Sequence, residues 1–446
     1  MRKLLICAAG LALCFASQAQ TNYTLSQILD SARVNNITLG NARLDVEAAR
    51  QQRLEAFTNF FPSISAAGMH FNANKGMMQT DINLADGISP EIAAVLAQIL
   101  PPEALASLSN PISIEMLKNG TVGAVTAVQP VFAGGRIVNG NKLARVGEEA
   151  GRLKLKLAEN KVDETAEQYF WQLASLLEKE KTVETVESLL GDISKDVNVA
   201  VDAGIAMRND LLQVQLRQND IASQKLKVNN GIRLVKMLLS QYCGLPDEDF
   251  SISYDSSEDI TLVERSDGDA AVAGTVEYKL LGKQLEAARL QHRMEVGKYL
   301  PTIAVGAGYN YHNLLDKDHH FGMVFATVTI PISDWWGGSH AIKRKKIAVQ
   351  QAQNQLNDNS ALLRIKIQSA WNDVEEASEQ LVIARRGIEQ AAENLRLNRD
   401  FYNAGTSRMT DLLEAQMLYQ QALDKQTDAF AAYHNKLAAY RHAIGQ

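Results

Sequence analysis

Two segments of the sequence, residues 203–215 and 404–416, carry the same pattern, and this duplication constrains the fold more than any other feature. Each segment begins with Ala-Gly and reaches Asp-Leu-Leu after five further residues, and the two copies lie 201 positions apart. Glycine suits the left-handed end of a helix, and aspartate suits an N-cap. The pattern predicts two helix–turn–helix units with Asp210 and Asp411 as N-caps, in a quasi-symmetric chain of two equivalent halves.

Other residues recur in the same order and support two halves. Pro130 and Pro331 are also 201 positions apart, and a pair of glycines follows each of them within a few residues. A second pair of prolines, Pro62 and Pro301, has a larger offset. The difference implies an insertion in the first half, over roughly residues 72–120.

The N-terminus is typical of a secretory signal peptide, residues 1–19. A basic start, an apolar run over residues 4–16 and small residues at the cleavage site precede Gln20. That run is too short for a membrane anchor helix, and the bulky residue before Cys14 disfavours lipidation. Removal of the signal leaves Cys243 as the only cysteine, which excludes an internal disulfide.

Two long stretches have the period of coiled-coil helices. Residues 136–202 and 338–403 would form helices of 67 and 66 residues, each about 100 Å long. Shorter helices are expected after each turn, over residues 210–243 and 411–444, and before the first strand, over residues 25–60. Apolar residues recur at seven-residue spacing in both long stretches: Leu176, Val183, Leu190 and Val197, then Leu381, Ile388, Leu395 and Tyr402.

Around the prolines the period changes from helical to two, which predicts strands. In residues 301–312 an apolar face that includes Ile303 and Tyr309 alternates with small or polar residues. The return strand, residues 321–332, carries Phe321, Met323 and Phe325 on one face. The first half should supply an equivalent pair, residues 62–72 and 121–130. Small residues on one face suit an aqueous lumen, with apolar side chains turned to lipid.

An open sheet of four strands cannot cross a bilayer, because its edge backbone groups would be unpaired in lipid. Two chains would supply eight strands and three would supply twelve. Since a barrel of eight is filled by its own side chains, a conduit favours at least three chains. Aromatic residues beside the strands are candidates for a membrane-interface belt: Phe60, Phe61, Tyr299, Trp335 and Trp336.

The composition predicts neither an enzyme nor a nucleic-acid-binding protein. The net charge is -6, and nucleophile elbows, P-loops and zinc-protease motifs are absent from the sequence. We expect no cofactor and no metal. One loop has metal-ligand chemistry, although such residues more often make a loop soluble: His312, Asp316, Asp318, His319 and His320. The acidic stretch 245–269 is expected to be a surface connector with a short strand near residues 250–254.

The duplicated turn motif, the proline-bracketed strand pairs and the long helices together resemble the TolC-like outer membrane efflux channel family (outer membrane factors). The resemblance covers nearly all of residues 20–446. It implies a mixed α and β membrane protein of two structural repeats, about residues 20–244 and 271–446, joined by the connector 245–270. It also implies a homotrimer, in which a 12-stranded β-barrel in the outer membrane of a Gram-negative bacterium continues as a 12-helix α-barrel through the periplasm.

The function implied by the resemblance is a passive exit duct of a tripartite efflux or secretion system. Its partners would be an inner-membrane pump, a periplasmic adaptor protein and outer-membrane lipid. The two turns would form the periplasmic tip that docks the adaptor. The residues expected at this tip are Gly204, Ile205, Met207, Asp210, Gly405, Thr406, Arg408 and Asp411.

Members of this family often narrow the periplasmic end with acidic residues shortly before the second turn. Here Arg396, Arg399 and Asp400 occupy that position, which argues against an acidic ring. Asp400 is expected to pair with Arg396 at the helical i, i+4 spacing, and a constriction gated by such pairs is a hypothesis. The insertion, with Pro101-Pro102, is longer than a hairpin loop requires, and we expect an extracellular cap or plug there.

The alternative is a periplasmic coiled-coil adaptor or structural protein without a pore. Adaptors also contain helical hairpins, but they lack strand pairs of lipid-facing character that repeat together with the helices. Dependence on detergent distinguishes the two classes. The sequence does not identify the cargo, because a passive duct is chemically unspecific.

Overall fold

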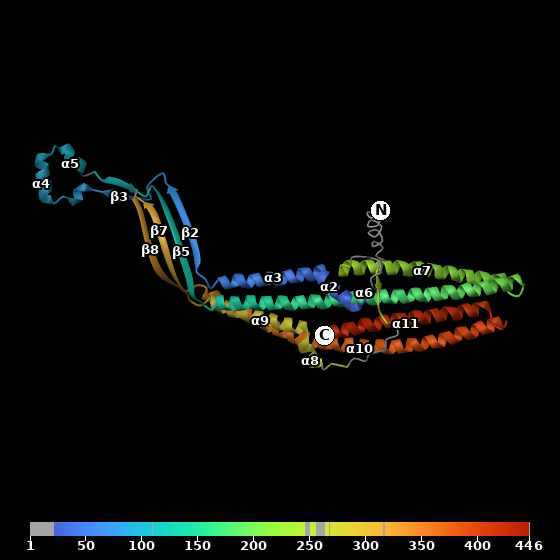
Figure 1. Cartoon of the computed structure of the whole chain (residues 1–446). Helices are drawn as coiled ribbons and strands as arrows, with labels where there is room; N and C mark the ends of the chain where they lie inside the picture. The colour runs from blue at the N-terminus through green and yellow to red at the C-terminus, as the bar shows by residue number, and fades with distance from the viewer. Residues whose placement is uncertain are drawn as a thin grey trace, which may run out of the picture. The chain divides into compact units, whose positions relative to one another are not determined.

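The computed structural model describes residues 22–108, 110–245, 250–255, 264–266, 268–314 and 317–445. The predicted signal peptide lies outside the described residues. The chain divides into two compact units, which we call the helical unit (Met1–Arg50, Val146–Ala287 and Gln350–Gln446) and the strand unit (Gln51–Arg145 and Ala288–Val349). Figure 1 shows the elements of both. Among the described residues, no helix is long and apolar enough to cross a membrane.

The strand unit contains one four-stranded antiparallel sheet in the order β2-β5-β7-β8. The four predicted strands are present, although the last begins and ends a few residues earlier than expected. Their bounds are β2 Ser63–Asn72, β5 Asn119–Ala133, β7 Thr302–Leu314 and β8 Lys317–Thr329. Within the described residues, no strand pairs with the outer edges of β2 and β8. The sheet is therefore open on both sides in a single chain.

The register corrects one feature of the predicted faces. Phe325 pairs with Gly306, and Phe321 pairs with Asn310, so the bulky residues of β8 share a face with the small residues of β7. The ring of Phe325 lies where a Cβ atom on Gly306 would be. We call this the mixed face. The opposite face, here the apolar face, carries exposed Ile64, Val125, Val305, Tyr309, Val324 and Val328.

The insertion in the first half contains regular structure, and we call residues 73–118 the excursion. Its elements are β3 Met78–Ile82, the 3-10 turn η1 Leu84–Gly87, α4 Pro90–Ile99, α5 Pro102–Leu108 and β4 Ile112–Met116. Strands β3 and β4 form a separate antiparallel ribbon. Figure 1 shows the excursion at the far end of the sheet, beyond β7 and β8.

Long helices dominate the rest of the described chain. The two longest, α6 Arg136–Asp202 and α10 Trp335–Asn403, have 67 and 69 residues. They lead into α7 Arg208–Cys243 and α11 Met409–Ala443. The remaining helices are α2 Leu25–Asn35, α3 Ile37–Thr58, α8 Gly268–Gly274 and α9 Val276–Lys298.

The prediction of a single helix over residues 25–60 is wrong, because the chain breaks at Asn36. The backbone of Asn36 is extended, with ψ 126°. Its side-chain oxygen accepts from the Thr38 N–H at 2.9 Å, and its amide donates to the Tyr242 carbonyl at 3.1 Å. The side chain of Asn36 is buried, and it hydrogen-bonds both a free N–H at the start of α3 and a free carbonyl at the end of α7. These two bonds stabilise the break between α2 and α3.

The helical unit is stabilised by two apolar clusters. The larger cluster surrounds Phe170, Leu173, Leu239 and Tyr440, and Trp371 packs against it. The smaller cluster joins residues of α7 and α11 to five residues of α6: Val183, Val186, Leu190, Ile193 and Val197. Three of the four predicted heptad residues of α6, Val183, Leu190 and Val197, are therefore confirmed as a buried seam, and the fourth, Leu176, is half-buried against the larger cluster.

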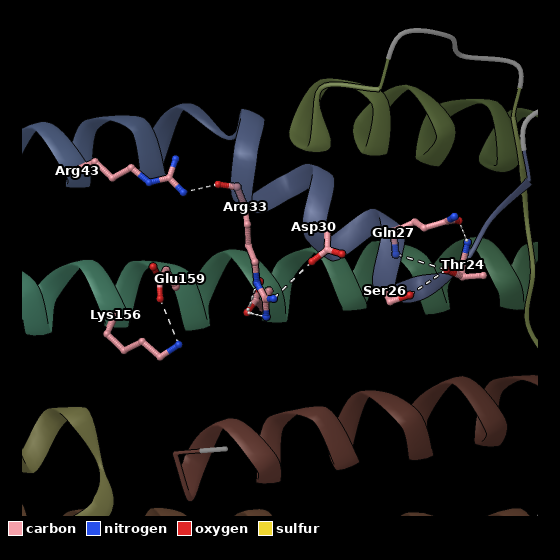
Figure 2. Close-up of polar contacts among 9 residues, drawn as sticks. Thr24, Ser26, Gln27, Asp30, Arg33, Arg43, Lys156 and Glu159 are labelled. Atoms are coloured by element: carbon pink, nitrogen blue, oxygen red, sulfur yellow. Dashed lines mark hydrogen bonds and ion pairs between the residues drawn. The ribbon is translucent and has the colours of Figure 1, made fainter.

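Polar contacts attach α2 to α6 (Figure 2). The Arg33 guanidinium donates to both carboxylate oxygens of Asp163, with Nε–Oδ1 3.0 Å and Nη2–Oδ2 2.8 Å. Asp163 is buried, so the bidentate pair satisfies a charge that would otherwise destabilise the core. Thr24 caps the start of α2 with a reciprocal bond to Gln27.

The connector is attached at both described ends. The predicted strand near residues 250–254 is present as β6 Ser251–Ile252, which pairs in parallel with β1 Asn22–Tyr23. Tyr254 donates its hydroxyl proton to Glu178 of α6 at 2.9 Å. At the other end, the Ser266 N–H donates to the Tyr440 hydroxyl at 2.9 Å.

Tyr440 gives a direct test of this core. Its side chain is 0% exposed, and its ring centroid lies 5.4 Å from that of Trp371. We expect Tyr440→Ala to lower the free energy of unfolding by about 3–5 kcal/mol, because it leaves a large cavity. Tyr440→Phe removes only the bonds to the connector and should cost about 1 kcal/mol. Chemical denaturation in detergent measures both, and equal losses for the two variants would contradict the packing role of the ring.

Candidate functional site

The two duplicated turns have the same backbone structure. At the end of α6, the Ile205 N–H donates to the Ala200 carbonyl at 2.8 Å, and at the end of α10 the Thr406 N–H donates to the Phe401 carbonyl at 2.9 Å. Gly204 and Gly405 have φ values of 76° and 74°. These bonds and angles define a Schellman motif, in which a left-handed glycine ends the helix. The predicted conformation of both glycines is confirmed.

The prediction that Asp210 and Asp411 are N-caps is wrong. The N-cap residues are Met207 and Arg408, and each aspartate lies three positions into the helix. From there the two carboxylates accept the N–H of the N-cap residue, both at 3.1 Å. This contact is the second half of a capping box, and it satisfies a backbone N–H that the helix itself leaves free.

The side chains of the two turns differ although their backbones agree. Ile205 is 83% exposed and Met207 is 74% exposed, so the first turn presents apolar surface. In the second turn, Thr406 donates its hydroxyl proton to the Phe401 carbonyl, and Ser407 donates to Asp411, both at 3.0 Å. The second turn therefore presents polar surface.

The methionine of the second turn lies one position later than the methionine of the first turn. The first turn reads Met-Arg where the second reads Arg-Met. Met409 of the second turn is 2% exposed and belongs to the smaller apolar cluster, whereas Met207 projects from the first turn. The second turn is therefore anchored by its methionine, and the first displays its methionine.

Both turns lie at one end of the helical unit (Figure 1). The smaller cluster joins them, since it contains Val197 and Val214 beside the first turn and Met409 and Leu412 at the second. Farther along the same helices, Arg217 of α7 donates to two glutamines of α11, Gln416 and Gln420, at 3.0 and 2.7 Å. The eight predicted tip residues are thus gathered at one end of this unit.

The predicted pair of Arg396 and Asp400 forms, at 2.8 Å. Arg396 also donates to both carboxylate oxygens of Glu393, at 2.9 and 2.8 Å, a contact that was not predicted. The hydrogen bond from Arg396 lowers the pKa of Glu393, and the same bond raises the pKa of Arg396. One arginine therefore bridges two carboxylates on α10, and Arg399 adds a second positive charge nearby in the sequence.

The predicted interface aromatics lie at the end of the sheet from which the long helices start. Phe60 and Phe61 precede β2 and are exposed, and both rings contact that of Phe57. Trp335 and Trp336 follow β8 and are also exposed. The Trp335 indole donates to the Tyr299 carbonyl at 2.9 Å, which ties the start of α10 to the start of β7.

The remaining candidates have structural explanations. Cys243 is buried, and burial raises the pKa of its thiol to about 12, so the thiol stays protonated. Asp318 accepts from Tyr311 and Asn313 at 2.8 and 2.7 Å. The described residues contain no group of three potential metal ligands, and Asp316 lies outside them.

Comparisons with known proteins identify a related family and related folds. Residues 282–446 match the family model of outer membrane efflux proteins. The fold is similar to that of the outer membrane protein VceC from Vibrio cholerae, with TM-score 0.74, 15% identity, and coverage of 94% of this chain and 96% of that one.

Two other solved channels have a similar fold. The Campylobacter jejuni CmeC outer membrane channel matches with TM-score 0.74 and 14% identity, over 97% of this chain and 90% of that one. The open state of the Neisseria gonorrhoeae MtrE outer membrane channel matches with TM-score 0.75 and 15% identity, over 94% and 88%. A comparison with curated protein sequences gives no match.

Proposed function

We propose that the chain is one subunit of the exit duct of a tripartite efflux or secretion system, on the premise of the outer membrane efflux protein model that residues 282–446 match. The duct lies in the outer membrane and extends into the periplasm. The observation that carries the proposal is the sheet of four strands with two open edges, continued in the chain by helices of 67 and 69 residues.

The open sheet supports a trimer. The edges of β2 and β8 require partners in lipid, and antiparallel pairing of β2 with β8 of a neighbour would supply them. Three chains would give a 12-stranded barrel with an aqueous bore. The apolar face would meet lipid, and the mixed face, which carries Ser65, Thr126 and Asn310, would line the bore.

The helices also present surfaces that suit neighbouring chains. Several large apolar residues of α7 and α10 are each more than half exposed in the single chain: Leu216, Leu226, Leu362, Ile365 and Ile383. Contact with adjacent subunits in a 12-helix barrel would bury them. Removal of apolar surface from water contributes about 25 cal/mol per Å² in favour of assembly, against the entropic cost of association.

Duplication would explain the architecture of one subunit. The order α3-β2-β5-α6-α7 is followed by α9-β7-β8-α10-α11, with the excursion inserted in the first half. The equal backbone geometry of the two turns supports the same interpretation. We infer two repeats, about residues 20–244 and 271–446, separated by the connector.

The turns are the proposed contact with a periplasmic adaptor, which would link the duct to an inner-membrane pump. A trimer presents three apolar turns and three polar turns, six in all. An adaptor whose contact surface alternates between apolar and polar sites would match these six turns. The group of Glu393, Arg396 and Asp400, close to the second turn in the sequence, is the proposed constriction.

Detergent extraction tests the function. The mature protein should require detergent, run as a trimer in size-exclusion chromatography with light scattering, and form ion-conducting pores in planar bilayers. A monomer that is soluble without detergent and inactive in bilayers would contradict the proposal and favour the pore-free coiled-coil adaptor instead.

A further inference from the structure

The excursion carries an exposed apolar surface that the proposed duct does not explain. In the ribbon of β3 and β4, register pairs Ile82 with Ile112 and Thr80 with Ile114, which puts these side chains on one face. Four apolar residues of this face are more than 40% exposed: Met78, Ile82, Ile112 and Ile114. The other face is polar, since Gln79 donates to Ser113 at 2.8 Å and Ser113 donates to Asp81.

Helix α4 adds a second apolar surface. Ser89 caps its start, and Pro90 occupies its first position. Ile92, Val95 and Ile99 follow helical spacing and are 56%, 56% and 72% exposed. A two-stranded ribbon is marginal in water by itself, and exposed apolar patches mark contact sites, so both surfaces require a partner.

In the proposed barrel, the position of the ribbon argues against membrane lipid as that partner. The ladder between β2 and β5 continues into the excursion through the bond from the Ala73 N–H to the Lys118 carbonyl, at 2.7 Å. β7 ends at Leu314, which pairs with Gly120, so the ribbon begins where β7 ends. β7 and β8 have 13 residues each, more than the roughly 9–11 that cross a bilayer. In the proposed barrel the ribbon would therefore lie beyond the membrane, past the end of the sheet opposite to the starts of α6 and α10.

Charge also disfavours an anionic membrane surface. Residues 73–118 contain two lysines, Lys75 and Lys118, against five acidic residues: Asp81, Asp86, Glu91, Glu103 and Glu115. Such a segment is repelled by lipid phosphates. The excursion starts from β2, the edge strand that pairs with a neighbour in the proposed trimer, so the chain enters the excursion beside the proposed subunit interface.

We propose that the three excursions of a trimer pack their apolar surfaces against one another and form a lid over the cell-surface mouth of the barrel. The occupant of each apolar surface is thus the same surface of a second copy. The inference rests on the proposed trimer, and it assigns to residues 73–118 a restriction of the mouth that is separate from the periplasmic constriction.

Cysteine cross-linking tests the contact in the full-length trimer. Val95→Cys should form inter-subunit disulfides under mild oxidation, seen as a dimer on non-reducing gels. Ala97 is exposed and lies about 200° around α4 from Val95, so the matched Ala97→Cys should remain monomeric on the gel. The native Cys243 does not interfere because it is buried.

Conductance tests the effect of the lid. Replacing Ile92, Val95 and Ile99 by Asp should separate the excursions and raise single-channel conductance by about 1.3-fold or more, because the lid is only one of two restrictions in series along the duct. Two results in trimers that conduct normally would refute the lid: the absence of Val95→Cys cross-links, or an unchanged conductance of the Asp variant. Neither result would contradict the proposed duct. A water-soluble maleimide can also be used to label Val95→Cys in the trimer. If this cysteine is protected from the maleimide only when lipopolysaccharide vesicles are present, its partner is lipid, and the lid is refuted. Loss of trimer and pore in the unmodified protein would instead refute the proposed function.

Discussion

Replacing Ile205-Ala206-Met207 by the Thr-Ser-Arg of the second turn should sharply reduce export while leaving the trimer and its conductance unchanged. The substitution keeps Gly204 and Asp210, and with them the Schellman bonds and the bond to the N-cap N–H. It removes two side chains that are 83% and 74% exposed. A side chain that anchors a protein interface contributes about 2 kcal/mol or more, and a trimer carries three copies of each.

Export of a pump substrate, measured as susceptibility of cells that depend on this duct, should fall by at least about ten-fold if even one such contact is lost. The matched control exchanges both turns, so that Ile-Ala-Met follows Gly405 and Thr-Ser-Arg follows Gly204. This variant keeps three apolar and three polar turns in each trimer and should retain export. Normal export by the first variant would show that the adaptor does not recognise the apolar turns.

The sequence predicts the ends of α6 and α10 correctly, because the left-handed backbone conformation at each end favours glycine. Gly204 and Gly405 adopt positive φ, which disfavours side chains with a Cβ atom, and this property is visible in the sequence. The same kind of signal places the two aspartates at the N-cap, whereas they lie at the third helical position. A carboxylate stabilises a helix start from either place, and the spacing to the following leucines fits both.

Other errors came from contacts between distant residues. The break at Asn36 depends on the Tyr242 carbonyl, more than two hundred residues later, and no glycine or proline stands beside it to mark it. The face shared by Phe325 and Gly306 depends on strand register, whereas alternation describes each strand by itself. Glu393 could have been found, since it lies three residues before Arg396 on a predicted helix.

The second large effect concerns the charged group before the second turn. The double variant Arg396→Ala and Asp400→Ala removes one positive and one negative charge, so the net charge of the subunit does not change. A change in conductance would then come from the width or the closure of the passage. If Arg396 holds Glu393 and Asp400 in a narrow ring of side chains, the variant should raise single-channel conductance by about two-fold or more.

Two controls separate this explanation from general loosening of the helices. Asp192→Ala with Lys195→Ala removes an exposed pair of opposite charges on α6, 3.4 Å apart, and should leave conductance unchanged. Arg399→Ala removes a positive charge but keeps the contacts of Arg396 with Glu393 and Asp400. It should shift the reversal potential toward cation selectivity, an effect that weakens as salt screens the charge, and should not widen the passage. Unchanged conductance in the Arg396 and Asp400 variant would refute a constriction at this position, because the bridge it removes is the structural basis of the narrowing.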